Sequence, residues 1–365
     1  MAHSNLKGGL HVFRIHMLAA DHGDCLWIEF GGTVPPKRIL IDAGTVGCYS
    51  RSLLPKIQKT VEMEGSCKFE LFVITHIDAD HIGGAIEFLK QTGENAVSIE
   101  EIWFNGYFHL SNISPSVLGA AQGEKLTPLV QNGPWDWNKR FKVLAVMVPD
   151  KGELPSFTFS GMRITLLSPT FEKLQKLKPK WEKEVQKAGL VPGQAFELED
   201  VLPDGFLGGA VENWADTAFK EDKAEPNGSS IAFIAEYEGK RVLFGADAHP
   251  TVLLESLKRA PLNLDRLPLC ALKLPHHGSK NNVSKELIKA FPAENYLVST
   301  NGQQFYHPDK EAIARILTQD KSATKTIHFN VQSEFNEIWK SNSHKSNWNY
   351  VANYGTKADG LVVNL

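Results

Sequence analysis

The sequence predicts an α/β fold, and three observations support this prediction. The run 71–74 is apolar and rich in β-branched and aromatic side chains, as a buried strand is, and polar residues follow it directly. Glycines at positions 83 and 84 permit a tight turn into a helix beginning near Ala85. A length of 365 residues, 42% of them hydrophobic, is ample for a buried core in one large domain with insertions or in two domains.

Composition narrows the range of functions. No apolar segment approaches the roughly 20 residues needed to cross a bilayer, so we expect no membrane partner. A net charge of -3 provides no global attraction to nucleic acid, so any site for a polyanion must be local. Residues 1–9 contain no apolar signal core, and the cysteines show neither paired metal spacing nor a disulfide-rich pattern. These features predict cytoplasmic residence with reduced thiols at Cys25, Cys48, Cys67 and Cys270.

Two imidazoles and two carboxylates lie within six positions directly after the apolar run 71–74. They are His76, Asp78, Asp80 and His81. Imidazole and carboxylate are ligands that divalent zinc and manganese accept, and packing them so closely costs charge repulsion unless a cation neutralises it. Ordinary capping and turn residues would explain one Asp at a helix start, but not this set. The segment therefore predicts a metal site at a strand end.

Residues 76–81 read His-x-Asp-x-Asp-His, which resembles the signature His-x-His-x-Asp-His of the metallo-β-lactamase superfamily. Asp78 in place of the second His is typical of one branch, the hydrolase domain of the DNA-internalisation competence protein ComEC and its stand-alone relatives. Further segments resemble that branch in the expected order: 21–30, 38–44, 227–233, 241–247, 272–279 and 306–308. The resemblance implies a four-layer αββα fold, with two mixed sheets between helices, and a metal-dependent hydrolase.

That fold assigns the elements in chain order. The first half would contain strands near residues 10–18, 24–30, 37–42 and 70–75. The second half would contain strands near 163–167, 230–237, 240–246, 269–274 and 295–299, and would close with 361–363. Residues 105–150 and 170–225 fall outside this pattern and are expected to be insertions, the second beginning with a Lys-rich helix. We therefore expect residues 1–365 to form a single hydrolase domain whose insertions determine substrate choice.

The resemblance also implies a centre for two divalent ions, Zn²⁺ or Mn²⁺. The implied ligands are His76 and Asp78 for the first ion, Asp80 and His81 for the second, Asp247 as a bridge, and one of His276 or His277 at the second ion. Two ions about 3.5–4 Å apart would lower the pKa of a water between them and bind both the attacking and the departing oxygen of a phosphoryl transfer. Asp24 and Asp42 are expected to orient ligand histidines through hydrogen bonds.

The first site is expected to lack one protein ligand. Residues 166–170 stand where relatives often have His-Pro, so this site would be completed by water, Asp216 or Glu212, or would be only weakly occupied. An oxygen ligand at Asp78 suits harder cations and shifts the preference from zinc toward manganese, which leaves the choice between the two metals open.

Asp80, Lys273 and His307 are the predicted catalytic residues. His307 would contact a non-bridging phosphate oxygen or protonate the leaving group. In the alternative interpretation it is only a residue at a helix N-terminus before Pro308. Lys273 would stabilise the charge of a pentavalent phosphorane, or else is a plain strand residue.

Three functions from different classes remain open. The first is a phosphodiesterase or nuclease acting on DNA, in line with the closest resemblance. The second is a hydrolase of a small phosphodiester, phosphocholine ester or lactone, and the third is a non-catalytic sensor or partner subunit. The segment 171–183 mixes basic residues with Trp181, which fits either a single-strand-binding surface or a solvated helix face. The predicted partner is DNA or another phosphodiester substrate, and the sequence identifies no protein partner.

Overall fold

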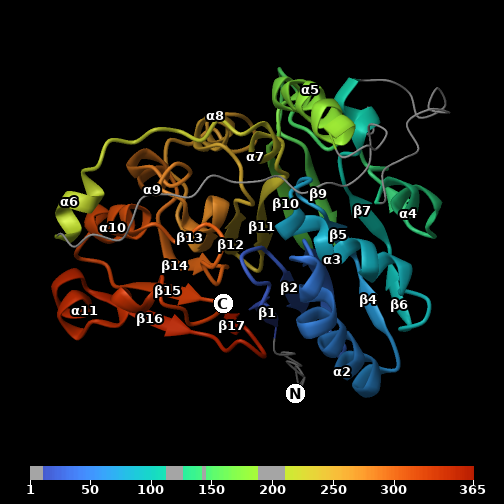
Figure 1. Ribbon diagram of the computed structural model, residues 1–365, viewed down its shortest axis with the longest axis horizontal. Coiled ribbons are helices and arrows are strands. Elements are labelled where there is room, and N and C mark those ends of the chain that lie inside the picture. The colour runs from blue at the N-terminus through green and yellow to red at the C-terminus, as the bar shows by residue number, and fades with distance from the viewer. Residues whose placement is uncertain (1–10, 112–125, 142–144, 188–209) are drawn as a thin grey trace, which may run out of the picture.

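A computed structural model describes residues 11–111, 126–141, 145–187 and 210–365. Two large sheets face each other, and helices cover the outer side of each sheet (Figure 1). The predicted four-layer αββα class is therefore confirmed. Residues 1–10, which carry the expectation about a signal core, lie outside the described residues, as do parts of both predicted insertions, 112–125, 142–144 and 188–209.

The first sheet has a mixed topology, with antiparallel pairs at its N-terminal strands and parallel pairs from β3 onward. Its described strands lie in the order β17 (Leu361–Asn364), β1 (Val12–Met17), β2 (Leu26–Gly31), β3 (Lys37–Ile41), β5 (Leu71–Val73), β7 (Glu101–Trp103) and β8 (Asp136–Trp137).

The second sheet is parallel from β12 to β16 and antiparallel at its other edge. Its described strands lie in the order β16 (Tyr350–Tyr354), β15 (Lys325–Phe329), β14 (Ala293–Val298), β13 (Leu269–Lys273), β12 (Lys240–Phe244), β11 (Ala232–Tyr237), β10 (Met162–Ser168) and β9 (Ser156–Phe159). A small parallel pair joins β4 (Cys67–Phe69) to β6 (Val97–Ile99).

The helices form the two outer layers. The described helices are α1 (Val46–Cys48), α2 (Leu54–Glu64), α3 (Ala79–Lys90), α4 (Thr127–Asn132), α5 (Phe171–Lys187), α6 (Val211–Ala215), α7 (Glu225–Gly228), α8 (Pro250–Leu257), α9 (Lys285–Ala290), α10 (Lys310–Gln319) and α11 (Asn342–Trp348). Short π or 3₁₀ turns are η1 (Tyr49–Leu53), η2 (Tyr107–Ser111), η4 (Pro275–Gly278) and η5 (Glu337–Lys340). Within the described ranges, no helix combines the length and apolar character that a membrane span requires.

Alternation along the strands explains the layering. In β5, Leu71 and Val73 pack in the core between the sheets, whereas Phe72 packs with α2 and α3 on the outer face. In β2, Ile28 likewise packs in the core between the sheets, whereas Trp27 packs on the outer face. Successive strand residues point to opposite faces, so a strand covered on both sides must be apolar throughout.

The helix after the metal loop begins earlier than predicted. It starts at Ala79, not near Ala85, and the two glycines lie inside it. A Cβ at Gly84 would come 2.2 Å from the Ala43 carbonyl oxygen. The glycines therefore allow α3 to pack closely against the loop after β3, and they do not form a turn before the helix.

Several elements differ from the predicted plan. The last strand, expected to close the second half, pairs with β1 in the first sheet, where Arg14 lies opposite Asn364. The predicted insertion 105–150 includes β8, which extends the first sheet beyond β7. Strands β7, β9, β15 and β16 were also not predicted. Strands β7 and β9 have only three and four residues, and β16 is an edge strand with polar side chains, so these three carry little periodicity to detect. Strand β15, with five residues inside the sheet, has no such explanation.

Candidate metal centre

The candidate site lies where parallel strands of both sheets end. Asp42 follows β3 and His76 follows β5 in the first sheet, while Asp247 follows β12 and His277 follows β13 in the second. Carboxyl ends of parallel strands meet at one edge of a sheet. Because the two sheets face each other, the loops at these strand ends come together although they are far apart in the sequence.

The turn between β13 and α9 presents two histidines through an unusual backbone. His276 has φ 46° and His277 has φ 53°, both in the left-handed region that residues with a Cβ seldom adopt. Asp42, Ala246 and Tyr306, in neighbouring loops, also have positive φ. Strained backbone of this kind concentrates at functional sites, where the surrounding structure holds it in place.

Asp247 is the centre of the cluster. Its Oδ2 atom lies 3.5 Å from His81 Nε2, 3.7 Å from His277 Nε2 and 3.8 Å from His76 Nε2. The Nε2 atom of His276 also lies 3.8 Å away. One carboxylate oxygen thus faces four imidazoles, which is the arrangement expected of a bridging ligand.

The other two carboxylates divide between two sides of Asp247. Asp78 Oδ2 lies 3.5 Å from His76 Nε2. Asp80 Oδ2 lies 3.2 Å from His277 Nε2 and 3.8 Å from His81 Nε2. The described residues therefore form one group of His76 and Asp78 and a second group of Asp80, His81 and His277, with Asp247 between them. Of the two histidines that the sequence left open, His277 lies in the second group.

Hydrogen bonds fix which ring nitrogen each histidine turns inward. His81 Nδ1 lies 2.8 Å from Asp42 Oδ2, and His277 Nδ1 lies 2.8 Å from the Ser299 carbonyl oxygen. The Thr75 hydroxyl donates to Asp42, so it accepts from His76 Nδ1 at 2.9 Å. All three rings consequently carry their proton on Nδ1 and present Nε2 to the cluster, which is how imidazoles ligate a metal when an outer partner orients them. Asp42 occupies the orienting position expected from the sequence.

Unsatisfied polar atoms test whether these residues fit a cation. Within the described structure, His76 Nε2, Asp78 Oδ1 and Asp247 Oδ1 are buried without a hydrogen-bond partner. Buried polar atoms are otherwise almost always paired, so such exceptions need an explanation. Two groups of three residues have ligand atoms close enough together to bind one metal ion. One group is His76, His81 and Asp247, and the other is Asp24, His81 and His277. Nitrogen and carboxylate donors of this kind fit divalent zinc or manganese.

The charges in the cluster depend strongly on one another. Burial would raise the pKa of Asp247, but His81, His277 and His276 hold it well below its usual range. Burial opposes a charge on His277, yet Asp247 and Asp24 raise its pKa to about 9. The cluster thus retains protons on imidazoles to neutralise its carboxylates. A divalent cation would take over that task and release the protons.

His276 is held differently from the other three histidines. Its Nδ1 lies 3.0 Å from Asn282 Oδ1 and 3.5 Å from Asp222 Oδ2. Asp222 is itself fixed by Asn227 at 2.7 Å and by Asn282 at 3.1 Å. The His276 side chain remains 22% exposed, whereas His277 is 1% exposed. His276 therefore lies on the open side of the cluster.

Asp222 and Asn282 were missed by the sequence analysis. Asp222 is in the segment expected to be an insertion, 54 positions before His276, and no local pattern connects the two. The sequence carries only a weak signal for Asp222. It is an acidic residue that stands a few positions before Pro226 and Asn227, where the segment 227–233 covered by the resemblance begins.

The first group has no third-motif histidine. Ser168 stands at that place, fully buried, with its hydroxyl unpaired within the described structure. Neither suggested substitute approaches: Asp216 is exposed and pairs with Lys285 at 2.5 Å, and Glu212 is exposed on α6. The structure thus gives the first group fewer protein donors than the second.

Lys273 and His307 are placed in different ways. The Lys273 ammonium is fully buried, 2.6 Å from Asp24 Oδ2 and 3.1 Å from the Leu274 carbonyl oxygen. It stabilises Asp24, which lies 3.5 Å from His277 Nδ1, and it does not face an open site. The His307 ring centroid lies 5.2 Å from that of His276, and its Nδ1 is buried without a hydrogen-bond partner. His307 therefore borders the open side of the cluster.

The Lys-rich helix offers no aromatic stacking surface at Trp181. This residue is 1% exposed and packs in the outer core of the first sheet, with its ring centroid 6.0 Å from that of Tyr107. Of the two interpretations of residues 171–183, the solvated helix face with a buried apolar stripe is the one that the structure supports.

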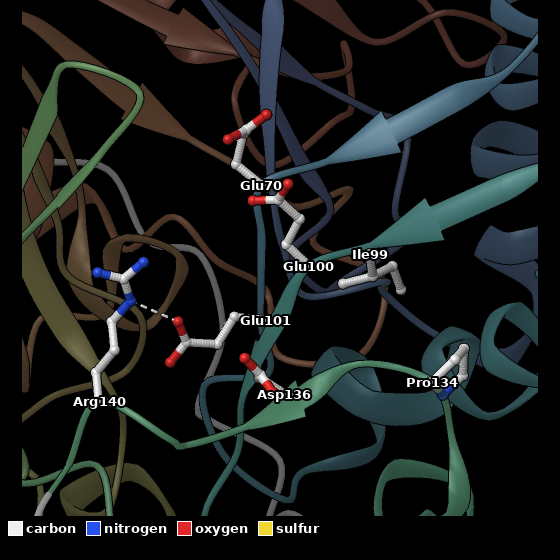
Figure 2. Close-up of a pocket in the computed structure, with 7 residues that line it drawn as sticks. All are labelled: Glu70, Ile99, Glu100, Glu101, Pro134, Asp136 and Arg140. Carbon is white, nitrogen blue, oxygen red and sulfur yellow. Dashed lines mark hydrogen bonds and ion pairs between the residues drawn. The ribbon is translucent and has the colours of Figure 1, made fainter.

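A separate hollow of about 440 Å³ lies at the opposite edge of the first sheet, beside the starts of β5 and β7 (Figure 2). Its carboxylates already have partners: Glu101 accepts from Arg140 at 2.6 Å, and Glu70 accepts from Lys37 and Ser160. We assign it no function.

Comparison with known proteins agrees with the fold. Residues 37–161, which include the 76–81 motif, match the family model described as the metallo-beta-lactamase superfamily. No curated protein matches this chain. The matched segment agrees with the fold described above and resembles a superfamily whose members are generally metal-dependent hydrolases.

Three solved structures are similar to this chain over most of its length. The metallo-beta-lactamase fold protein YhfI from Bacillus subtilis is 10% identical at a TM-score of 0.41, covering 97% of this chain and 100% of that one. Zn(2+)-bound PqqB from Methylobacterium extorquens is 9% identical at 0.41, covering 96% and 100%. A diphosphatase from the PhnP family is 11% identical at 0.38, covering 98% and 98%. At these values none of them bears on the function of this chain.

Proposed function

We propose that this protein is a metal-dependent phosphodiesterase and that DNA is its first substrate to test. The observation that carries the proposal is the position of Asp247. It lies between a His-Asp pair on one side and an Asp-His-His set on the other, with its Oδ2 within 3.5–3.8 Å of four imidazole nitrogens. Such an arrangement suits two divalent ions sharing one carboxylate, the usual requirement for phosphodiester hydrolysis by paired metals.

His76, Asp78 and Asp247 would hold one ion, and Asp80, His81, His277 and Asp247 the other. Bound ions would supply Lewis-acid activation of the phosphate and of the attacking water. Asp42 accepts the Nδ1 proton of His81 and the Ser299 carbonyl accepts that of His277, so each ring would offer Nε2 to a bound ion.

His276 would contact the substrate phosphate. Its Nδ1 is held by Asn282 and Asp222, and its Nε2 faces the open side beside Asp247. Asp247 and Asp222 overcome the effect of burial and raise the pKa of His276 to about 10. A protonated His276 would donate a hydrogen bond to a non-bridging oxygen, whose charge grows during attack. His307, next to this ring, is the second candidate for that contact or for protonating the leaving group.

A small phosphodiester is the second candidate substrate. Trp181, the aromatic residue of the predicted single-strand-binding surface, is buried, and Lys273, predicted to stabilise a phosphorane, is ion-paired inside the protein, so neither is available to a nucleic acid. The resemblance to the competence nuclease branch supports DNA, while the net charge of -3 provides no global attraction to a nucleic acid.

Hydrolysis assays separate these possibilities. We would measure turnover of bis-p-nitrophenyl phosphate and of single- and double-stranded DNA, with manganese, zinc or a chelator. Asp247→Asn would be the test variant, and Asp216→Asn, at an exposed carboxylate that pairs with Lys285, the matched control. Metal-dependent DNA cleavage that is lost only in Asp247→Asn supports the nuclease. Cleavage of the small ester alone supports the second candidate, and no turnover on any ester would contradict the enzyme and favour a sensor or partner subunit.

A further inference from the structure

A row of aromatic rings borders the open side of the cluster. The ring centroid of Phe305 lies 5.4 Å from that of His22, which meets it edge-on, and 6.3 Å from that of His307. His307 in turn lies 5.2 Å from His276. The row therefore runs from the proposed phosphate contact to Phe305, which is partly exposed.

The backbone holds this row close to the candidate metal ligands. Next to His22, a Cβ at Gly23 would come 1.7 Å from the Asp80 carbonyl oxygen, so this loop packs directly on the start of α3, which carries Asp80. Burial lowers the pKa of His22, and Asp80 and His277 act on it through their charges. Both observations place His22 beside the second group of ligands.

The loop that carries Phe305 is fastened at both ends. The Asn301 amide donates to the Asp21 carbonyl oxygen at 2.6 Å, and the Asp309 amide donates to the Gly278 carbonyl oxygen at 3.0 Å. Phe305 is thus a ring on a fixed loop that joins the His22 loop to the His276 turn. A ring held in this way loses little conformational entropy when it packs against a ligand.

We propose that Phe305, with His22 beside it, stacks a nucleobase of the substrate next to the scissile phosphate. This inference rests on the proposed phosphodiesterase function and names its substrate class as a nucleotide ester. Stacking suits this place because every nucleobase has a π-face, so contact with an aromatic side chain favours nucleotides without reading their sequence.

Two esters that differ only in the base test the proposal. They are the p-nitrophenyl ester of thymidine 5′-phosphate and the corresponding ester of abasic deoxyribose 5′-phosphate. We expect Phe305→Ala to raise KM for the thymidine ester about 5- to 150-fold, the range for loss of one stacked base. KM for the abasic ester should change less than about threefold, and kcat for both should be nearly unchanged. Phe305→Tyr, which keeps a ring, should behave like the wild type.

A control variant addresses disturbance of the loop. Phe335 packs against Tyr306 of the same loop, with ring centroids 5.3 Å apart, but lies outside the aromatic row. Phe335→Leu should therefore leave the preference for the thymidine ester intact. Calorimetric binding of thymidine 5′-monophosphate to the manganese-loaded protein gives a readout that needs no turnover, and Phe305→Ala should weaken it by the same factor.

The outcomes separate the stacking proposal from the phosphodiesterase proposal. Equal effects of Phe305→Ala on both esters, or unchanged nucleotide binding, would overturn the stacking proposal while the phosphodiesterase stands. If the wild type hydrolyses neither ester, and also neither DNA nor bis-p-nitrophenyl phosphate, the proposed function fails. Phe305-dependent binding of thymidine 5′-monophosphate would then still support the nucleotide site, and its absence would overturn both.

Discussion

Asp42→Asn should weaken metal binding without unfolding the protein. Asp42 Oδ1 accepts from the Thr75 amide at 2.8 Å, while Oδ2 accepts from the Thr75 hydroxyl at 2.7 Å and from His81 Nδ1 at 2.8 Å. Both Asp42 and the His81 side chain are fully buried. An asparagine that keeps the bond from the Thr75 amide would turn its NH₂ group toward two donors, so His81 would have to move its proton from Nδ1 to Nε2.

That change would put a proton on the atom that faces the cluster. Loss of an outer carboxylate partner typically lowers metal affinity 10- to 100-fold, which is about 1.4–2.7 kcal/mol. We would measure Mn²⁺ and Zn²⁺ affinity by competition with a chelator, with Asp216→Asn as the exposed control. Far-UV circular dichroism and thermal unfolding at saturating metal would establish that the variant is folded. A folded Asp42→Asn protein with affinity within about twofold of the wild type would refute the orienting role of Asp42.

Three further predictions follow from the same geometry. Asp222→Asn should lower kcat for phosphodiester hydrolysis about 10- to 100-fold because His276 would be misplaced. The metal content, counted by inductively coupled plasma mass spectrometry, should not change. Loss of metal would contradict the assignment of Asp222 to positioning His276. Burial opposes a charge on His277, yet Asp247 and Asp24 raise its pKa to about 9, and Asp247 likewise raises the pKa of His81 well above its usual range. A binding ion must displace these protons, so Mn²⁺ affinity should rise at least about tenfold per pH unit from 7 to 9. A flat profile in calorimetric titrations would count against displacement. Trp181→Ala should cost about 3–5 kcal/mol in urea unfolding because the side chain is 1% exposed, whereas a loss of DNA affinity at unchanged stability would show that Trp181 contacts nucleic acid.

The sequence was most informative where the chemistry is local. His76, Asp78, Asp80 and His81 lie within six positions, so the pattern alone predicted a metal loop after a strand. The strands β2, β3 and β11 to β14 were predicted to within a few residues, because they are continuous apolar runs that end in turn residues.

Long-range relationships were beyond the sequence. Asp222 reaches His276 only because the chain before α7 folds back onto the β13 turn, and spacing along the chain carries no trace of that contact. Burial converted Lys273 from a predicted charge-stabilising residue into the partner of Asp24, and Trp181 from a possible stacking ring into core. The last strand was assigned to the wrong part of the fold because pairing with β1 is decided by tertiary packing.

The central claim is that Asp247 lies between two divalent ions, and metal stoichiometry tests it most directly. We would load the wild type and Asp247→Asn with manganese or zinc and remove the excess metal. Inductively coupled plasma mass spectrometry would then count the ions per chain. The account predicts two ions in the wild type and a clear loss in the variant, with Asp216→Asn unchanged. A wild-type content of one ion or less, or full occupancy retained in Asp247→Asn, would contradict it.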